Sequence, residues 1–285
     1  MEKNKLKLAI CFTLAGTVNQ TVHDLDRLRS FISAVISSVE HAPYINNVMV
    51  LIAMDSARED VTHYLQLEKE YPTLTIVLAD LSKVSRAYLY LASFEAALAH
   101  GADLILEIDP TGSHNPQEIP AFIQPLAAVL ADDKNLMGCV MSTRFSHGGK
   151  NSYPYFNVLV SKVGTVLARG FLGIGDAGKD LTDLTSGFEA FSATLLKKLL
   201  EIIPAKNWVS SYWGPLHLFQ TEMRVMVFWL AAKYKITIFQ RGISFGVNRT
   251  KDPKMPSFSY LFHAFIGFWL LMREYFHFKT KLRTN

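Results

Sequence analysis

The stretch Ala102-Asp-Leu-Ile-Leu-Glu-Ile-Asp-Pro-Thr-Gly-Ser-His-Asn-Pro-Gln-Glu118 decides the fold class of this chain. Residues 102–106 are almost entirely apolar and predict a largely buried strand, which a Pro- and Gly-rich turn and a helix start follow. An Asp just beyond the carboxyl end of such a strand lies where open α/β sheets bind ligands, so Asp109 is the first candidate functional residue. A purely structural role stays open, in which Asp109 begins the turn and Ser113 or Asn115 caps the helix.

Strand and helix patterns alternate on both sides of this stretch. Apolar runs predict strands, and apolar residues at helical spacing predict helices between them. The alternation predicts an α/β fold with a mainly parallel sheet flanked by helices. We expect one domain over residues 1–255 and an amphipathic tail over 256–285. The predicted strands are 6–14, 47–54, 74–79, 102–107, 136–142 and 236–244, and the predicted helices are 24–39, 61–71, 85–100, 119–131, 156–172, 193–203 and 219–233.

The composition excludes some classes of protein. The chain has 285 residues, 49% of them hydrophobic, and a net charge of +4 without the dense basic stripe that nucleic-acid binding needs. Cys11 and Cys139 lie in apolar runs and predict buried thiols in a reducing compartment. Lys3, Lys5 and Lys7 precede an apolar run in the manner of a signal peptide, but that run also predicts the first strand. We therefore expect an uncleaved cytoplasmic protein.

Six landmarks follow one another in a fixed order after residue 101. They are Asp109 to Glu118, Ser142-Thr-Arg-Phe-Ser-His-Gly-Gly149, Ser161-Lys162 with Leu167-Ala-Arg169, Asp183-Leu-Thr-Ser-Gly-Phe188, Phe219-Gln-Thr-Glu222, and Asn248-Arg249 with Lys254-Met255. Together they resemble the motifs of family 2 glycosyltransferases of the GT-A fold, especially the dolichol- or polyprenyl-phosphate mannose synthase branch. The resemblance implies a nucleotide-sugar donor, a divalent metal and transfer of a hexose to an acceptor, often a lipid phosphate.

The metal implied by the resemblance is Mg²⁺ or Mn²⁺, and it would neutralise the charge on the departing diphosphate. Asp109 is the expected ligand. The family carries a second Asp two residues further on, where this chain has Thr111, so we expect weaker metal binding unless Glu107 or His114 compensates. For Glu107 we favour a structural role over metal binding, as a residue at the end of the strand that faces solvent.

The donor site is expected at the ends of the first strands. Asp55 lies where the family has Asp-Asp-Gly-Ser and can accept hydrogen bonds from a base or ribose, although a turn-forming role is open. Asn19 is the nearest counterpart of the family's Pro-x-Tyr-Asn-Glu. Glu222 belongs to the matched Phe-Gln-x-Glu motif and is a further candidate for binding the donor.

A lipid-phosphate acceptor is already an anion and can attack the anomeric carbon without a general base. It needs cations to position the phosphates, a task that Arg performs well. The candidates at matched positions are Arg144, Lys162, Arg169, Arg249 and Lys254, although Lys162 and Arg169 also fit a solvated helix face.

Glu189 departs from the family, which has Arg after Ser-Gly-Phe. A carboxylate beside a phosphate site would repel the substrate. Either Glu189 points elsewhere or the acceptor is not a lipid phosphate. A sugar hydroxyl would need a base, and Asp183 or Glu189 would then be the candidates.

The tail suggests a membrane surface. Residues 257–272 are rich in aromatic and apolar residues but too short to span a bilayer, and Arg273, Lys279, Lys281 and Arg283 follow. Aromatics between basic residues suit an anionic interface, although a helix packed on the domain or in an oligomer fits too. We expect a cytoplasmic protein held peripherally at the membrane. Two other functions stay open, a catalytically silent scaffold of a glycan-assembly complex and a nucleotidyltransferase.

Overall fold

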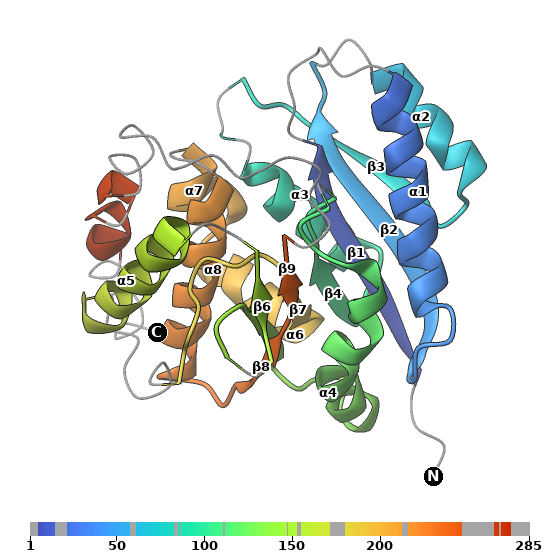
Figure 1. Ribbon diagram of the computed structural model, residues 1–285. Coiled ribbons are helices and arrows are strands. Elements are labelled where there is room, and N and C mark those ends of the chain that lie inside the picture. The colour runs from blue at the N-terminus through green and yellow to red at the C-terminus, as the bar shows by residue number, and fades with distance from the viewer. Residues whose placement is uncertain are drawn as a thin grey trace.

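A computed structural model of the chain describes residues 5–14, 22–57, 61–82, 85, 87–110, 112–146, 148–152, 155–171, 180–212, 216–246, 265–267 and 269–274 (Figure 1). The predicted sites Asn19, Thr111, Arg249 and Lys254 lie outside these residues, as does most of the tail.

Seven strands form one sheet in the order β3-β2-β1-β4-β7-β5-β8. Every neighbouring pair is parallel except those of β7, which runs antiparallel to both β4 and β5. A small second sheet pairs β6 (Lys150–Asn151) with β9 (Ser244–Phe245). The predicted α/β fold with a mainly parallel sheet is confirmed. The seven strands are β1 (Leu6–Leu14), β2 (Ile45–Asp55), β3 (Leu74–Ala79), β4 (Leu104–Glu107), β5 (Gly138–Thr143), β7 (Glu189–Ser192) and β8 (Thr237–Gly242).

Helices cover both faces of the sheet (Figure 1). The long helices begin and end within three residues of the predicted positions. The helices are α1 (Val22–Val39), α2 (Val61–Glu70), α3 (Tyr88–Ala99), α4 (Ile119–Asp132), α5 (Tyr155–Phe171), α6 (Ala193–Ile202), α7 (Val209–Tyr212) and α8 (Leu216–Ala231), with short 3₁₀ turns at Pro116–Glu118 and Ala205–Asn207.

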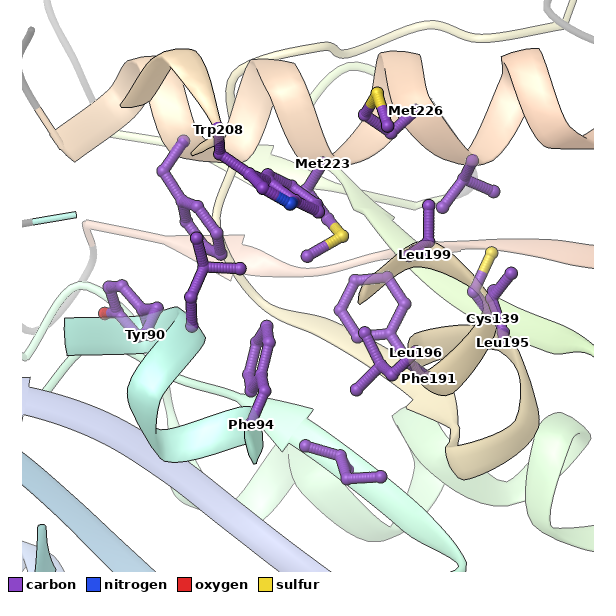
Figure 2. Packing of buried hydrophobic residues seen from close by; sticks show 14 of the residues in the cluster. Tyr90, Phe94, Cys139, Phe191, Leu195, Leu196, Leu199, Trp208, Met223 and Met226 are labelled. Carbon is purple, nitrogen blue, oxygen red and sulfur yellow. The ribbon is translucent and has the colours of Figure 1, made fainter. Parts of the chain in front are cut away.

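Two apolar cores result, one on each face of the sheet. One joins α1, α2 and α4 to the sheet. The other joins α3, α6 and α8 to it, and Figure 2 shows Tyr90, Phe94 and Phe191 among its members. Tyr90 stacks on Phe219 of α8 with ring centroids 5.3 Å apart. Cys11 and Cys139 are buried free thiols, as predicted.

β7 is the one strand of the seven-stranded sheet that the sequence pattern does not predict. It has four residues, one of them Glu189, and is too short for a periodic signal. It lies between β4 and β5, where Glu107 and Glu189 are cross-strand partners. The expectation that Glu107 faces solvent is therefore wrong. Glu107 is 1% exposed, because β7 covers that edge of β4 and Gln220 of α8 lies against its carboxyl group.

Residues 265–267 and 269–274 of the tail are helical. Leu271 is buried, and a Cβ on Gly267 would lie 2.9 Å from Leu218 of α8. This part of the tail therefore packs on the domain. None of the helices described here is both long enough and apolar enough to cross a bilayer.

Candidate active site

The carboxyl ends of the parallel strands carry the predicted donor residues. Asp55 is the last residue of β2, and Asp109 follows β4 by two residues. The Asp55 Oδ1 accepts a hydrogen bond from the backbone N–H of Ala57 at 3.1 Å, so its carboxylate shapes the turn. This contact uses one oxygen only, and ligand binding by Asp55 stays a prediction.

His114 organises the loop after β4. Its Nδ1 accepts a hydrogen bond from the backbone N–H of Asp109 at 3.2 Å. The imidazole is buried, stacks on Phe188 at 5.2 Å and meets the edge of Phe245 at 5.1 Å. Asn115 caps the following 3₁₀ turn by accepting the N–H of Gln117. His114 thus fixes the backbone at Asp109, and this use of Nδ1 competes with the predicted metal binding.

No group of three His, Cys, Asp or Glu side chains able to hold a metal occurs in the described ranges. Asp109 is half-buried at the sheet edge, and metal binding by its carboxylate stays a prediction. One or two carboxylates with substrate phosphates suffice for Mg²⁺. The described residues therefore fit a metal that the donor diphosphate itself helps to hold.

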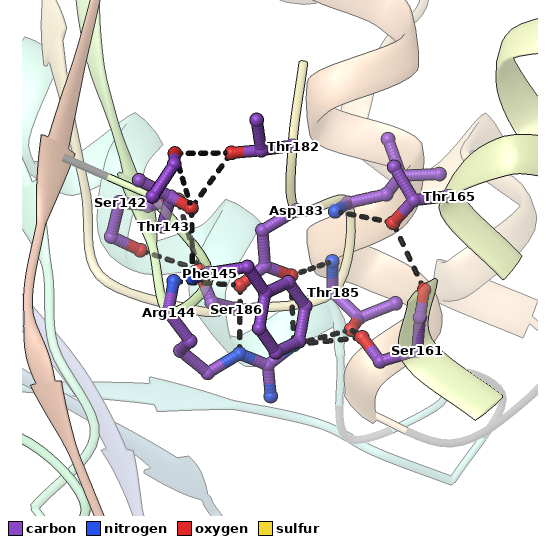
Figure 3. A network of polar contacts seen from close by, with 12 residues as sticks. Ser142, Thr143, Arg144, Phe145, Ser161, Thr165, Thr182, Asp183, Thr185 and Ser186 are labelled. Carbon is purple, nitrogen blue, oxygen red and sulfur yellow. Dashed lines mark hydrogen bonds and ion pairs between the residues drawn. The ribbon is translucent and has the colours of Figure 1, made fainter. Parts of the chain in front are cut away.

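The strongest polar constellation lies at the end of β5, where Arg144 meets Asp183 (Figure 3). The Arg144 Nε donates to Asp183 Oδ2 and its Nη2 donates to Asp183 Oδ1, each at 2.7 Å. Nη2 also donates to Ser161 of α5 at 2.9 Å and to Thr185 at 2.7 Å. Nη1 donates to none of the described residues. The guanidinium is thus fixed through Nε and Nη2.

Asp183 is fully buried and serves Arg144. Burial would raise the pKa of its carboxyl, but the adjacent Arg144 guanidinium outweighs burial and holds the pKa below its usual range. Both oxygens accept hydrogen bonds from Arg144. A general base must reach the substrate proton and have a pKa near the working pH, so this geometry does not suit Asp183 as a base.

A second arginine, Arg224 of α8, binds residues 183–189 from the interior of the protein. It is fully buried and ion-paired through Nε with Glu189. Its Nη1 donates to the carbonyl oxygen of Asp183, and Nη2 donates to the carbonyl oxygen of Ser186 at 2.8 Å. Glu189 therefore points into the interior and is not beside an open phosphate site. Its predicted role as a base is equally unsuited to this buried position.

The sequence analysis missed Arg224. The available signal was a single arginine inside the otherwise apolar run from Met223 to Leu230, which indicates a buried cation that needs a partner. Glu189 is the matching single acid among apolar residues. An ion pair between Arg224 and Glu189 can be predicted from the sequence only if both side chains are first expected to be buried.

The turn between Asp183 and β7 is strained. Phe188 has a φ of 107°, a left-handed value rare for a residue with a side chain. It is buried and packs on His114 and on Phe122, whose ring centroid is 4.3 Å away. Such outliers persist where the surroundings over-determine the backbone, and they cluster at functional sites. Phe188 thus couples this turn to the Asp109 loop through His114.

The loop after β5 closes tightly around Arg144. A Cβ on Gly149 would lie 2.3 Å from the carbonyl oxygen of Thr143 and 2.9 Å from the carbonyl carbon of Arg144. Only glycine therefore allows this approach. Two cations contact the Phe145 ring, whose centroid is 5.0 Å from the Arg144 Cζ and 5.3 Å from the Lys162 Nζ. Arg144 and Lys162 are thus brought together.

The other predicted cofactor-binding residues lie apart from this cluster. Arg169 is exposed in the last turn of α5. Glu222 is buried, and its two oxygens accept the backbone N–H groups of Val209 at 2.7 Å and Ser210 at 2.8 Å. These contacts give Glu222 a structural role at the start of α7. Binding of a cofactor by Arg169 or Glu222 stays a prediction.

The chain is similar in sequence to known proteins over part of its length. No family model matches the chain. The chain is 26% identical over 185 residues to a polyprenol monophosphomannose synthase of Mycolicibacterium smegmatis, covering 63% of this chain and 64% of that protein. It is 27% identical over 161 residues to an undecaprenyl-phosphate mannosyltransferase of Micrococcus luteus, covering 56% and 61%. A UDP-N-acetylglucosamine–dolichyl-phosphate N-acetylglucosaminyltransferase of Methanococcus voltae is 35% identical over 38% of this chain and 39% of its own length.

The matched part is therefore less than two thirds of the length of each of these relatives. Among solved structures, a 4-diphosphocytidyl-2C-methyl-D-erythritol synthase of Anaerococcus prevotii has a TM-score of 0.45 and 11% identity, covering 92% of this chain and 96% of its own. Residues 1–349 of TarS from S. aureus have a TM-score of 0.42 and 12% identity, covering 84% and 60%. Likeness at this level carries no inference about function. The relatives by sequence confirm that the chain resembles family 2 glycosyltransferases of the polyprenyl-phosphate mannose synthase branch.

Proposed function

We propose that this chain is a glycosyltransferase of the GT-A fold that moves a hexose from a nucleotide sugar to a polyprenyl phosphate. The observation that carries the proposal is Arg144, a guanidinium fixed by Asp183, Ser161 and Thr185, whose Nη1 donates to no other residue in the part of the chain that the structure describes. Lys162 adds a second cation that contacts the same Phe145 ring as Arg144. A fixed guanidinium with a second cation nearby suits the recognition of a phosphate monoester. The names of the sequence relatives support the same substrate class.

In the reaction a phosphate oxygen of the acceptor attacks the anomeric carbon of the donor. The new C–O bond forms as the bond from that carbon to the nucleoside diphosphate breaks, and the diphosphate leaves with the electron pair. The acceptor phosphate is already ionised, so no side chain has to remove a proton. This fits the buried, paired state of Asp183 and Glu189.

The chain's residues would act mainly by binding and orientation. Arg144 and Lys162 hold the acceptor phosphate. Asp109, with its backbone fixed by His114, faces the donor diphosphate. Mg²⁺ or Mn²⁺, when bound there, neutralises charge on the leaving group. We further infer a peripheral association with the cytoplasmic membrane surface, in part through the tail 256–285.

The test is a reconstitution assay with the purified chain. Vesicles containing undecaprenyl phosphate are incubated with a panel of nucleotide hexoses and Mn²⁺, and glycolipid is detected by mass spectrometry. We expect one hexose to be transferred. The Arg144→Lys variant keeps the charge but loses the planar fork, so it should lower activity by at least about a hundredfold.

Arg29→Gln is the matched control. Arg29 is also paired with a carboxylate, Glu70, but at an exposed site on α1, where such pairs contribute little. Its activity should equal that of the wild type. Nucleotide binding without transfer of any hexose would overturn the proposal and favour the scaffold function.

A further inference from the structure

Arg224 contacts both of the chain segments that build the Arg144 site. One segment is the end of β5, where Ser142 lies two residues before Arg144, and the other begins with Asp183, the partner of Arg144. The Arg224 Nη2 donates to the Oγ of Ser142 at 3.3 Å and to the carbonyl oxygen and Oγ of Ser186 at 2.8 and 3.1 Å. Its Nη1 donates to the carbonyl oxygen of Asp183. One guanidinium thus holds the two segments together.

The two segments also bond directly to each other (Figure 3). The Oγ atoms of Ser142 and Ser186 lie 2.6 Å apart, and the Ser186 Oγ donates to the carbonyl oxygen of Ser142 at 3.1 Å. The backbone N–H of Arg144 donates to the Asp183 Oδ2 at 3.1 Å. All these bonds depend on the spacing between the two segments, and Arg224 contacts both sides of that spacing. The position of Arg144 therefore depends on Arg224.

Arg224 is itself held from two directions. It belongs to α8, where its neighbours Met223 and Val225 are buried in the core. Its Nε is paired with Glu189 of β7, which lies between β4 and β5 in the sheet. A side chain that packing and ion pairing fix in this way can hold other groups in place to within a fraction of an ångström.

A role in stability alone would not require an ion pair at this position. Taking two charges out of water is costly, and replacing a buried pair by well-packed apolar residues is often neutral or stabilising. Only the Nε of Arg224 is used for Glu189, whereas Nη1 and Nη2 bind the two segments of the Arg144 site. The pair is also a feature of this chain, because the family that it resembles has Arg at the position of Glu189.

We propose that Arg224 is a positioning residue for the acceptor phosphate, and that it acts on Arg144 through Asp183 and Ser142. It is fully buried and so acts from behind the site, without touching the substrate. This role rests on the proposed function, in which Arg144 holds the acceptor phosphate. When the contacts of Arg224 are lost, the two segments can shift, and a displacement of about 1 Å at a binding group can cost about a hundredfold in rate.

Arg224→Lys is the variant that separates position from charge. Lysine keeps a positive charge beside Glu189, but its single nitrogen cannot replace the planar fork that reaches both carbonyl oxygens. The assay uses a water-soluble prenyl phosphate as the acceptor and the hexose donor that the wild type accepts. We expect the KM for the acceptor to rise at least about tenfold, whereas the KM for the donor stays within about twofold of the wild type.

A merely structural role predicts a different kinetic result. A destabilised enzyme has a smaller folded fraction, which lowers the measured kcat and leaves both KM values unchanged. Arg29→Lys is the matched control, because Arg29 is paired with Glu70 at an exposed site, and it should keep both wild-type KM values. An unchanged acceptor KM in folded Arg224→Lys overturns the proposal, and so does an equal rise in the KM for donor and acceptor.

A second variant covers the case in which Arg224→Lys does not fold. Arg224→Met/Glu189→Gln removes both charges, so no uncompensated charge stays buried, but it also removes the donors to Asp183 and Ser186. It should show the same rise in acceptor KM. A folded double variant with the acceptor KM of the wild type overturns the proposal.

Hydrogen exchange measures the fixing of the site without any substrate. The backbone N–H groups of Arg144 and Thr185 both donate to Asp183. In Arg224→Lys their exchange should become at least about tenfold faster, and that of β2 should stay as in the wild type. Unchanged exchange at Arg144 and Thr185 overturns the proposal.

Binding without turnover separates the positioning role from the proposed function. Calorimetry with the soluble prenyl phosphate measures its affinity directly. If the wild type binds it but transfers no hexose, and Arg224→Lys binds it at least about tenfold more weakly, the proposed function is overturned and the positioning role is supported. If the wild type transfers hexose and both proteins bind with equal affinity, only the positioning role is overturned. A wild type that binds no prenyl phosphate overturns both.

Discussion

Glu189 and Arg224 form an ion pair that is entirely closed to solvent, between β7 in the middle of the sheet and α8 above it. The same guanidinium donates to the carbonyl oxygens of Asp183 and Ser186. Asp183 in turn fixes Arg144, the candidate phosphate ligand. Two buried pairs thus meet at one short segment, and the inner pair sets the position of the outer one.

The inner pair should be essential for stability. Arg224→Met leaves the Glu189 carboxylate buried without its counter-charge and should lower the free energy of unfolding by about 3–5 kcal/mol. The double variant Arg224→Met/Glu189→Gln removes that uncompensated charge and should recover part of the loss. Urea unfolding of both proteins measures the difference. A double variant no more stable than Arg224→Met would show that charge is not the cause.

Gly149 should be irreplaceable at the Arg144 loop. Gly149→Ala places a Cβ against backbone atoms of Thr143 and Arg144, which cannot move aside, and should cost about 1–3 kcal/mol. Gly164→Ala in α5 is the control, because nothing lies within 4 Å of its Cβ. It should stabilise the protein by about 0.5–1 kcal/mol through helix propensity. Thermal or urea unfolding compares the two, and equal effects would contradict the assigned clash.

Glu222 should make the stability depend on pH. Burial raises the pKa of the Glu222 carboxyl from 4.5 to about 7. The hydrogen bonds that it accepts from the N–H groups of Ser210 and Val209 lower this pKa but do not outweigh burial. Between these pH values the unfolded chain releases the proton and the folded chain keeps it, so stability falls as pH rises from 4.5 to 7 and then levels off. The loss attributable to Glu222 is about 3 kcal/mol.

Glu222→Gln removes this titration while keeping the shape of the side chain. The free energy of unfolding of the wild type should therefore fall more steeply between pH 4.5 and 7 than that of Glu222→Gln. Parallel curves would mean that the carboxyl of Glu222 titrates normally in the folded protein.

Asp109 should link nucleotide binding to the metal. A nucleotide sugar with Mn²⁺ should stabilise the chain by about 2.7 kcal/mol at a hundred times Kd, seen as a rise in Tm. Asp109→Asn should lose the part of this rise that depends on Mn²⁺. Asp103→Asn, at the other end of the same strand and bonded to Lys7 and Lys134, should keep it. A rise in Asp109→Asn as large as in the wild type would remove Asp109 from the metal site.

Local sequence patterns determined the framework. The strands at 6–14 and 74–79 begin and end at the predicted residues. The apolar run of β1 is buried, because its transfer from water dominates the local energetics. The fold class and the place of Asp109 at the sheet edge follow from these runs alone. The sequence allowed either Ser113 or Asn115 as the cap of the turn, and in the structure Asn115 is the cap.

What the sequence by itself determined is the α/β alternation and the set of motifs, since both are local. Only the tertiary structure decided that β7 enters the sheet antiparallel, that Glu107 is buried, that Arg144 pairs with Asp183, and that Arg224 holds the turn from behind. It alone showed that α5 turns its apolar face outward. The partners of these contacts lie 35 residues or more apart, and no local pattern states which distant groups will share one desolvated site.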